Sequence, residues 1–191
     1  MKQIIIALLL SIPIMGLAKK TDDTKYLKGA VPEENGVITF SKSFSVQGKN
    51  QQEIRQTICS VVKEKIMAPA IDELRTRFVS DGAEDGIIVA RVEEYMVFKS
   101  KPLYLDRTRF RYMLTAKVSE NDVKMQISQI SYYYNEDMEG KNGIEYKGEE
   151  WISDEEALNK QGTKLYPKSG KFRRKTVDRV EAIFQDIENA F

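Results

Sequence analysis

Hydrophobic and polar positions alternate along several stretches of the chain, as they do in strands that bury one face. Residues 103–118 have the cleanest alternation and predict a strand with one core face and one wet face. Its core positions are Phe110, Tyr112, Leu114, Ala116 and Val118. Strands are also predicted over 37–46 and over 87–98, where apolar residues on parts of both faces favour a central position in the sheet.

A fourth strand is predicted over 123–134, but its apolar register changes from odd to even positions along the way. A slip of one residue turns every side chain of a strand to the other face. A bulge near Ser128 or Gln129 reconciles the two halves, because a bulge inserts one extra residue into a strand.

Apolar residues at steps of three and four predict two main helices. The first opens near Asn50, is ended or kinked at Pro69, and has a bent continuation through 71–78. Its stripe is Ile54, Ile58, Val61, Val62 and Ile66, and the continuation adds Ile71, Leu74 and Phe78. The second covers 171–191, with a stripe of Val177, Val180, Ile183, Phe184, Ile187 and Phe191 that must dock on something. Ser153 followed by Glu156 predicts a capped short helix.

The remaining stretches are expected to be loops or an extended lead-in. Residues 135–148 and 162–170 are polar and contain glycine, and residues 19–35 end at a turn. Antiparallel strands with helices on one face form an α+β two-layer sandwich. We therefore expect a single α+β domain over 36–191, with a core over roughly 36–134 and a C-terminal loop and helices over 135–191.

The start of the chain has the three-part organisation of a secretory signal peptide. Lys2 supplies a positive charge, and the apolar run that follows is too short for a membrane span. Gly16 and Ala18 place small residues at the positions that a signal peptidase reads. We expect cleavage after Ala18, giving a periplasmic or secreted protein whose mature chain has no transmembrane segment.

Composition excludes several classes of function. Without residues 1–18 the chain has 29 basic and 29 acidic residues, and this neutrality argues against a nucleic-acid partner. The absence of histidine excludes Ser-His-Asp and Cys-His catalysis and histidine zinc sites. Cys59 is the single cysteine, so no intramolecular disulfide can form, and its thiol is expected to pack as a small hydrophobe. No cofactor is predicted.

The first candidate contact residues are Arg107, Arg109 and Arg111. A spacing of two places all three guanidinium groups on one strand face, where they can clamp a carboxylate, phosphate or sulfate. The alternative is that they pair with Glu93 across the sheet and keep an exposed face soluble.

A second candidate lies in the cationic run 171–175, which includes Arg173 and Arg174. At a helix start the dipole disfavours cations, so the run can mark a contact with an anion or a lipid headgroup. The alternative is a solvated helix start that the acidic segment 149–156 offsets.

Other patterns are weaker. Residues 135–140 resemble the opening of a calcium loop, but Tyr146 stands where a bidentate glutamate is needed, so no metal site is predicted. Glu93 and Glu94 are adjacent on a strand and face opposite ways, so they cannot share a substrate atom. Three successive tyrosines, 132–134, are expected in the core or at its rim.

Four separated segments closely resemble one protein family. They are KYLKGAVPEENGVITFSKSF (25–44), LDRTRFRY (105–112), EEWISDEEALNK (149–160) and SGKFRRKTVD (169–178). The family consists of exported Bacteroidetes proteins with a domain of unknown function and a TBP-like fold. The resemblance implies an antiparallel sheet backed by helices and a Gram-negative envelope setting, and it implies no activity. The TATA-box protein binds DNA through a tandem duplication, and because this chain has one copy, that function does not follow.

These observations favour a non-enzymatic envelope module that binds a partner protein or a small ligand, through the sheet face or the groove between sheet and terminal helix. One alternative is a carrier of a small apolar ligand in that groove. The other is a hydrolase that uses carboxylates or a Ser-Lys pair, both of which are compatible with the absence of histidine. The oligomeric state is not predicted.

Overall fold

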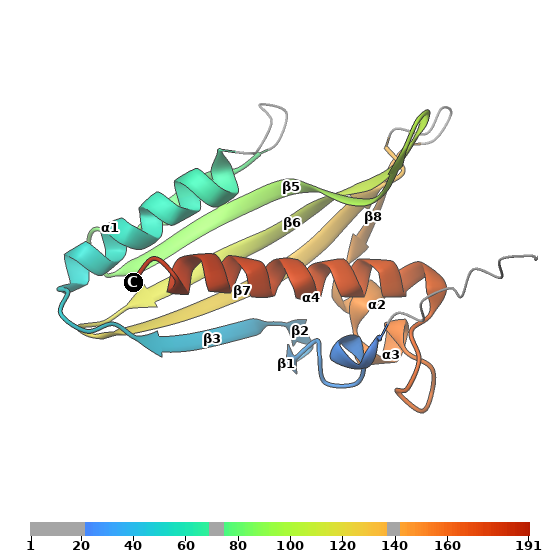
Figure 1. Ribbon diagram of the computed structural model, residues 1–191, viewed down its shortest axis with the longest axis horizontal. Helices are drawn as coiled ribbons and strands as arrows, with labels where there is room; N and C mark the ends of the chain where they lie inside the picture. Colours follow the sequence, from blue (N-terminus) through green and yellow to red (C-terminus); the bar gives the residue numbers. More distant parts are fainter. Residues whose placement is uncertain (1–21, 69–74, 137–141) are drawn as a thin grey trace, which may run out of the picture.

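The computed structural model describes residues 22–68, 75–136 and 142–191 (Figure 1). The predicted signal peptide, residues 1–18, lies outside the described residues. In the described part, β3, β7, β6, β5 and β4 form a sheet in that order, and β8 also pairs with β7. Every paired strand runs antiparallel to its neighbour. The fold is therefore the predicted α+β sandwich, an antiparallel sheet backed by helices.

Three long strands form the centre of the sheet, and shorter strands form its edges. The long ones are β5 (Ile87–Lys101), β6 (Tyr104–Val118) and β7 (Asp122–Tyr134). The short ones are β3 (Phe40–Ser45), β4 (Arg77–Asp81) and β8 (Ile144–Lys147). β5 lies between β4 and β6, which confirms its predicted inner position.

The predicted bulge in β7 is confirmed. Arg111 of β6 pairs with Ser131, whereas Met113 pairs with Ser128, so β7 carries one extra residue between the two pairs. Gln129 has a φ of 52° there, in the left-handed region. β3 pairs with the part of β7 before the bulge and β8 with the part after it, so two strands share one edge.

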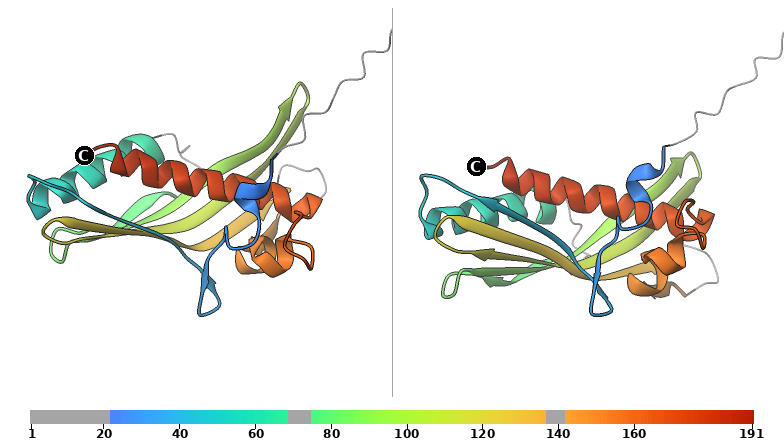
Figure 2. Two further views of the ribbon diagram at one scale, coloured as in Figure 1. Left: turned by 60° about the horizontal axis from the view of Figure 1, so that its bottom comes forward. Right: turned by 90° about the horizontal axis from the view of Figure 1, so that it is seen from below.

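Both main helices cover the same face of the sheet (Figure 2). They are α1 (Gln51–Val61), which continues into the π-helix η2 (Val62–Met67), and α4 (Pro167–Glu188). Asn50 and Glu53 form a capping box at the start of α1, each side chain accepting from the other's backbone amide at 2.9 and 2.8 Å. No helix among the described residues is long and apolar enough to cross a membrane.

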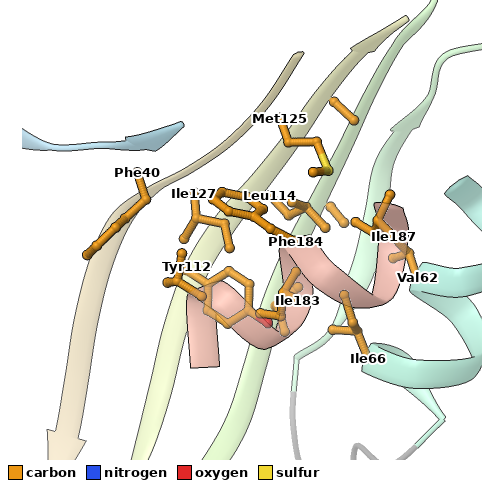
Figure 3. Packing of buried hydrophobic residues seen from close by; sticks show 14 of the residues in the cluster. Phe40, Val62, Ile66, Tyr112, Leu114, Met125, Ile127, Ile183, Phe184 and Ile187 are labelled. Carbon is orange, nitrogen blue, oxygen red and sulfur yellow. The ribbon is translucent and has the colours of Figure 1, made fainter. Parts of the chain in front are cut away.

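The core fills the space between these helices and the sheet (Figure 3). The predicted core face of β6 is confirmed, because all five of its residues from Phe110 to Val118 are at most 2% exposed. Phe184 and Ile187 of α4 and Val62 and Ile66 of η2 point toward this face. The terminal helix therefore docks on the sheet through the stripe that its periodicity predicts, although Phe191 lies beyond its end and is partly exposed.

The bent continuation of the first helix is wrong at its described end. Phe78 lies in β4, where it pairs with Ala90. The spacing of Ile71, Leu74 and Phe78 fits a helical stripe, but hydrogen bonding to β5 determines the structure at Phe78. Pro69, Ile71 and Leu74 lie outside the described residues.

Two predicted boundaries in the C-terminal part also change. Residues 144–147 form β8 rather than a loop, because Tyr146 pairs with Tyr132 and extends the sheet. The last helix begins at Pro167, a position where proline is favoured since its missing N–H needs no partner. The cationic run 171–175 is therefore not at the helix start.

Two short helices lie near β8 (Figure 1). They are α2 (Glu149–Ile152) and α3 (Asp154–Ala157). Ser153 caps α3 by accepting from the Glu156 amide at 3.3 Å, as predicted, whereas α2 was not expected.

The lead-in is more structured than an extended segment. It contains the 3₁₀ turn η1 (Thr24–Tyr26) and a small hairpin of β1 (Glu33–Glu34) and β2 (Val37–Ile38). Asn35 and Gly36 join these strands with φ of 53° and 78°, which a two-residue hairpin turn requires. The predicted turn before the first strand is thus confirmed, and Ile38 is fully buried.

Candidate functional site

Arg107, Arg109 and Arg111 lie on the outer face of the sheet, meaning the face opposite α1 and α4. They alternate along β6 with the buried core residues, and each is partly buried itself. Glu93 of β5 binds the guanidinium groups of Arg111 at 3.0 Å and of Arg109 at 3.7 Å. Arg107 stacks over the Tyr95 ring, with the guanidinium carbon 3.8 Å from the ring centre. The cross-sheet pairing with Glu93 is therefore present.

Glu93 is only 3% exposed, although it lies on the outer face. Its carboxylate also accepts from the Arg75 amide at 3.0 Å, and Thr76 bonds its backbone on the β4 side. Burial alone would raise the pKa of this carboxyl, but the bonds from the Arg75 amide and the Arg111 guanidinium outweigh burial and lower the pKa below its ordinary value. Glu93 is therefore ionised at neutral pH.

The outer ends of this row are also paired. Arg109 donates to Glu136 at 2.6 Å, and Arg111 donates to the exposed Glu145 of β8 at 3.2 Å. Both guanidinium groups thus bind carboxylates of the chain itself. An external anion would have to displace one of these carboxylates, so the geometry does not offer a ready clamp.

Arg173 is buried inside the protein rather than placed at its surface. It is 0% exposed and donates to the carbonyl oxygens of Tyr26, Leu27 and Ile152 at 2.6, 2.8 and 2.7 Å. Its charge faces the Asp154 carboxylate at 2.5 Å. Burial lowers the pKa of Arg173 from its ordinary value, and the Asp154 contact partly offsets this. These bonds hold the lead-in, α2 and α3 to α4.

Arg174 performs a related role nearer the surface. It makes a two-pronged contact with Asp23 at 2.6 and 2.7 Å, with about a third of each side chain exposed. Together, Arg173 and Arg174 fasten residues 22–27 to the terminal helix.

A groove of about 320 Å³ lies between α4 and β5. Glu94 binds Arg179 there through two hydrogen bonds of 2.8 Å, and the Tyr112 hydroxyl donates to Glu94 at 3.2 Å. Burial raises the pKa of Tyr112, so its hydroxyl remains a donor. Glu93 and Glu94 do face opposite ways, as predicted. Four of the nine lining residues are charged, which does not favour an apolar ligand in this groove.

Other candidate chemistry is not assembled in the described residues. None of their acidic and thiol side chains forms a group of three or more that could hold a metal ion, and residues 137–140 of the calcium-like stretch lie outside the described residues. Cys59 is buried with its Sγ 3.6 Å from the Asp81 carbonyl oxygen, and burial raises the pKa of its thiol. Such a thiol packs as a hydrophobe, in agreement with expectation.

The structure adds a candidate that the pattern along the sequence does not indicate, the end of the β5–β6 hairpin. We call residues Val97–Leu105 the hairpin tip. Leu103 is fully exposed, and Tyr104, Leu105 and Val97 are 54%, 49% and 39% exposed. β4 pairs with β5 only to Arg91 and β7 pairs with β6 only from Thr108, so among the described residues no strand flanks the tip. It projects beyond the body of the sheet (Figures 1 and 2).

Leu103 also has an unusual backbone. Its φ is 64°, in the left-handed region. Pro102 and Leu103 are the first and second residues of the two-residue turn that joins β5 to β6. Glycine or asparagine is preferred there because a larger side chain strains the backbone. The sequence carries a signal for this turn, since Pro102 lies between two long alternating stretches, but the alternation alone places Leu103 in the following strand.

The chain is similar to solved proteins of one fold. A family model described as "Domain of unknown function (DUF4468) with TBP-like fold" matches residues 40–133. A DUF4468 family protein from Bacteroides ovatus is 37% identical, with 90% of this chain and 95% of that chain covered and a TM-score of 0.78. A TBP-like protein from Parabacteroides distasonis shares the fold, at 20% identity, 84% and 96% coverage and a TM-score of 0.68.

No curated protein gives a significant match. The resemblance that the four sequence segments carry is confirmed by the family model and by the identity to the Bacteroides ovatus protein over most of both chains. The chain belongs to the DUF4468 family, whose domain has a TBP-like fold.

Proposed function

We propose that this protein is a non-enzymatic binding module of the cell envelope and that the hairpin tip is its contact surface. The exposure of Leu103 and its neighbours supports this proposal. Single exposed apolar residues are common. Here, however, four of the nine large hydrophobic residues that are exposed in the described part fall within the nine residues of the tip. Such a concentration is typical of an interaction site.

The framework behind the tip suits a binding role. β5 and β6 each continue as one strand from the core into the tip, with a register shift of their pairing between Val97 and Lys99 at its base. At its base the Phe98 ring packs against Phe172 of α4 at 4.5 Å, and Lys171 lies over Phe98 at 4.4 Å. A contact surface on rigid elements loses little conformational freedom on binding.

The alternatives lack a comparable observation. The carboxylates of Glu93 and Glu94 are bound to arginines on opposite faces, so these two do not form a carboxylate pair for hydrolysis. The serine hydroxyls that hydrogen-bond among the described residues contact carboxylates, amides or carbonyl groups rather than lysine amines. The charged groove beside α4 does not favour an apolar cargo.

Site-specific photo-crosslinking in the envelope of producing cells tests the proposal. A photoreactive residue at position 103 should form adducts with a neighbouring molecule, because a binding surface holds its partner within reach. The matched control is Val79, which is 60% exposed in β4 away from the tip and should give none. Equal adduct yields at both positions, or no adduct at 103, would contradict the proposal.

A further inference from the structure

We infer that the hairpin tip docks on an anionic lipid surface, an inference that rests on the binding role proposed above and names the partner. The observations that carry it are the chemistry of the tip, its charge and its small contact area.

The exposed apolar side chains of the tip gather at and next to its turn. Pro102 and Leu103 form the turn itself, and Tyr104 and Leu105 follow immediately. The most exposed apolar side chains of the tip therefore lie at the end of the ribbon. Leucine gains free energy on entering the boundary between headgroups and acyl chains. Tyrosine favours the same depth, because its ring is apolar and its hydroxyl stays in the headgroup layer.

The charge of the tip is complementary to an anionic surface. Residues 95–105 contain Lys99 and Lys101 and no acidic residue. The nearest carboxylates in sequence, Glu94 and Asp106, are each bound to a cation of α4, at 2.8 Å to Arg179 and 2.7 Å to Lys171. The tip is therefore locally positive although the whole chain is nearly neutral. Lysines next to an apolar tip are attracted to anionic headgroups while the tip enters the interface.

The size of the tip favours a lipid surface over a protein partner. The end of a two-stranded ribbon presents only a few side chains. A stable protein interface needs roughly 800 Å² from each partner. Interfacial membrane binding needs only a few inserted apolar groups and nearby cations. The strained backbone at Leu103 agrees with this, because it keeps a large apolar side chain where glycine would fit with less strain.

Vesicle sedimentation tests the inference with the protein purified from the envelope. Vesicles of phosphatidylglycerol and phosphatidylcholine should sediment the protein, vesicles of phosphatidylcholine alone should do so weakly, and high salt should reduce binding. Leu103→Asn should weaken binding by about tenfold or more, since asparagine accepts positive φ and removes only the apolar group. Lys99→Gln combined with Lys101→Gln should give a loss of about tenfold at low salt.

Matched controls separate a specific loss from unfolding. Val79→Thr removes an exposed apolar side chain from β4 and should bind like the wild type. Circular dichroism melts should show no loss of stability for any variant. All variants have the same N-terminus, so any uncleaved signal peptide contributes equally to the vesicle binding of each. In addition, tryptophan fluorescence of Leu103→Trp should shift to the blue with anionic vesicles.

The outcomes distinguish this inference from the proposed function. No binding to anionic vesicles, or equal binding by the wild type and Leu103→Asn, would overturn the inference. Self-association that depends on Leu103, or photo-crosslinks from position 103 to protein alone, would also overturn it and leave the binding role intact. Failure of both vesicle binding and crosslinking would reject the two together.

Discussion

Glu93 shows how single residues organise the outer face. It is 3% exposed and lies among two arginines and a backbone amide, so its charge is balanced mainly by groups of the protein. Removing one partner of a buried pair usually costs more than the pair itself contributes, because the remaining charge is left uncompensated. Glu93 thus links Arg109 and Arg111, while Glu136 and Glu145 bind the other sides of these two guanidinium groups.

We expect Glu93→Gln to lower the free energy of unfolding by about 2–3 kcal/mol at neutral pH, somewhat less than for a fully buried pair because both arginines are partly exposed. The direction in which the free energy of unfolding changes with pH follows from the lowered pKa of Glu93. The wild type has this stabilisation above the ordinary carboxyl value of 4.5 and loses it as the pH falls through the lower folded pKa. Urea unfolding across this range should show a weaker acid dependence for the variant.

Glu145→Gln is the control for this prediction. Glu145 also binds Arg111, but its side chain is 59% exposed, so the change should cost less than about 1 kcal/mol. Similar losses for the two variants would mean that burial of Glu93 has no special effect.

At the scale of elements, α4 is the part that closes the fold. Its stripe packs on the sheet, Arg173 and Arg174 hold the lead-in, and Arg179 and Lys171 bind Glu94 and Asp106. Cations of the helix therefore join it to four other parts of the chain, namely the lead-in, α3, β5 and β6.

Phe184→Ala should lower the free energy of unfolding by about 3–5 kcal/mol, because the residue is 6% exposed and leaves a cavity against the sheet. Denaturant unfolding measures the change. Gln185→Ala, on the exposed side of α4, should change stability by no more than about 0.5 kcal/mol. A small effect of Phe184→Ala would show that the helix is only loosely docked.

The sequence predicts elements well where periodicity is strong. The alternation in 103–118 specifies the buried face of β6, and the register change in 123–134 specifies the bulge. Prediction from the pattern fails where pairing with a distant strand determines the secondary structure. Phe78 joins a strand because it pairs with β5. The short segment 144–147 forms β8 because it pairs with the edge of β7. Burial of Arg173 has no local signal, since its carbonyl partners Tyr26 and Leu27 lie at the other end of the chain.

For the molecule as a whole, export remains a prediction from the first residues. If the leader is cleaved, N-terminal sequencing of the protein from the envelope should begin at Lys19 or within one or two residues of it. Asp23, which binds Arg174, would then lie close to the mature N-terminus. An intact Met1 on the envelope protein would contradict the prediction.

The hydrogen bonds between the lead-in and α4 have a consequence for the timing of folding. These hydrogen bonds, which include one from Lys25 to Asp178, join residues 146 to 153 positions apart in a chain of 191 residues. A chain that emerges from its N-terminus must wait for α4 before these bonds can form, and contacts of such long range form slowly. Late closure by α4 would thus leave the lead-in without its anchor until α4 itself has been synthesised.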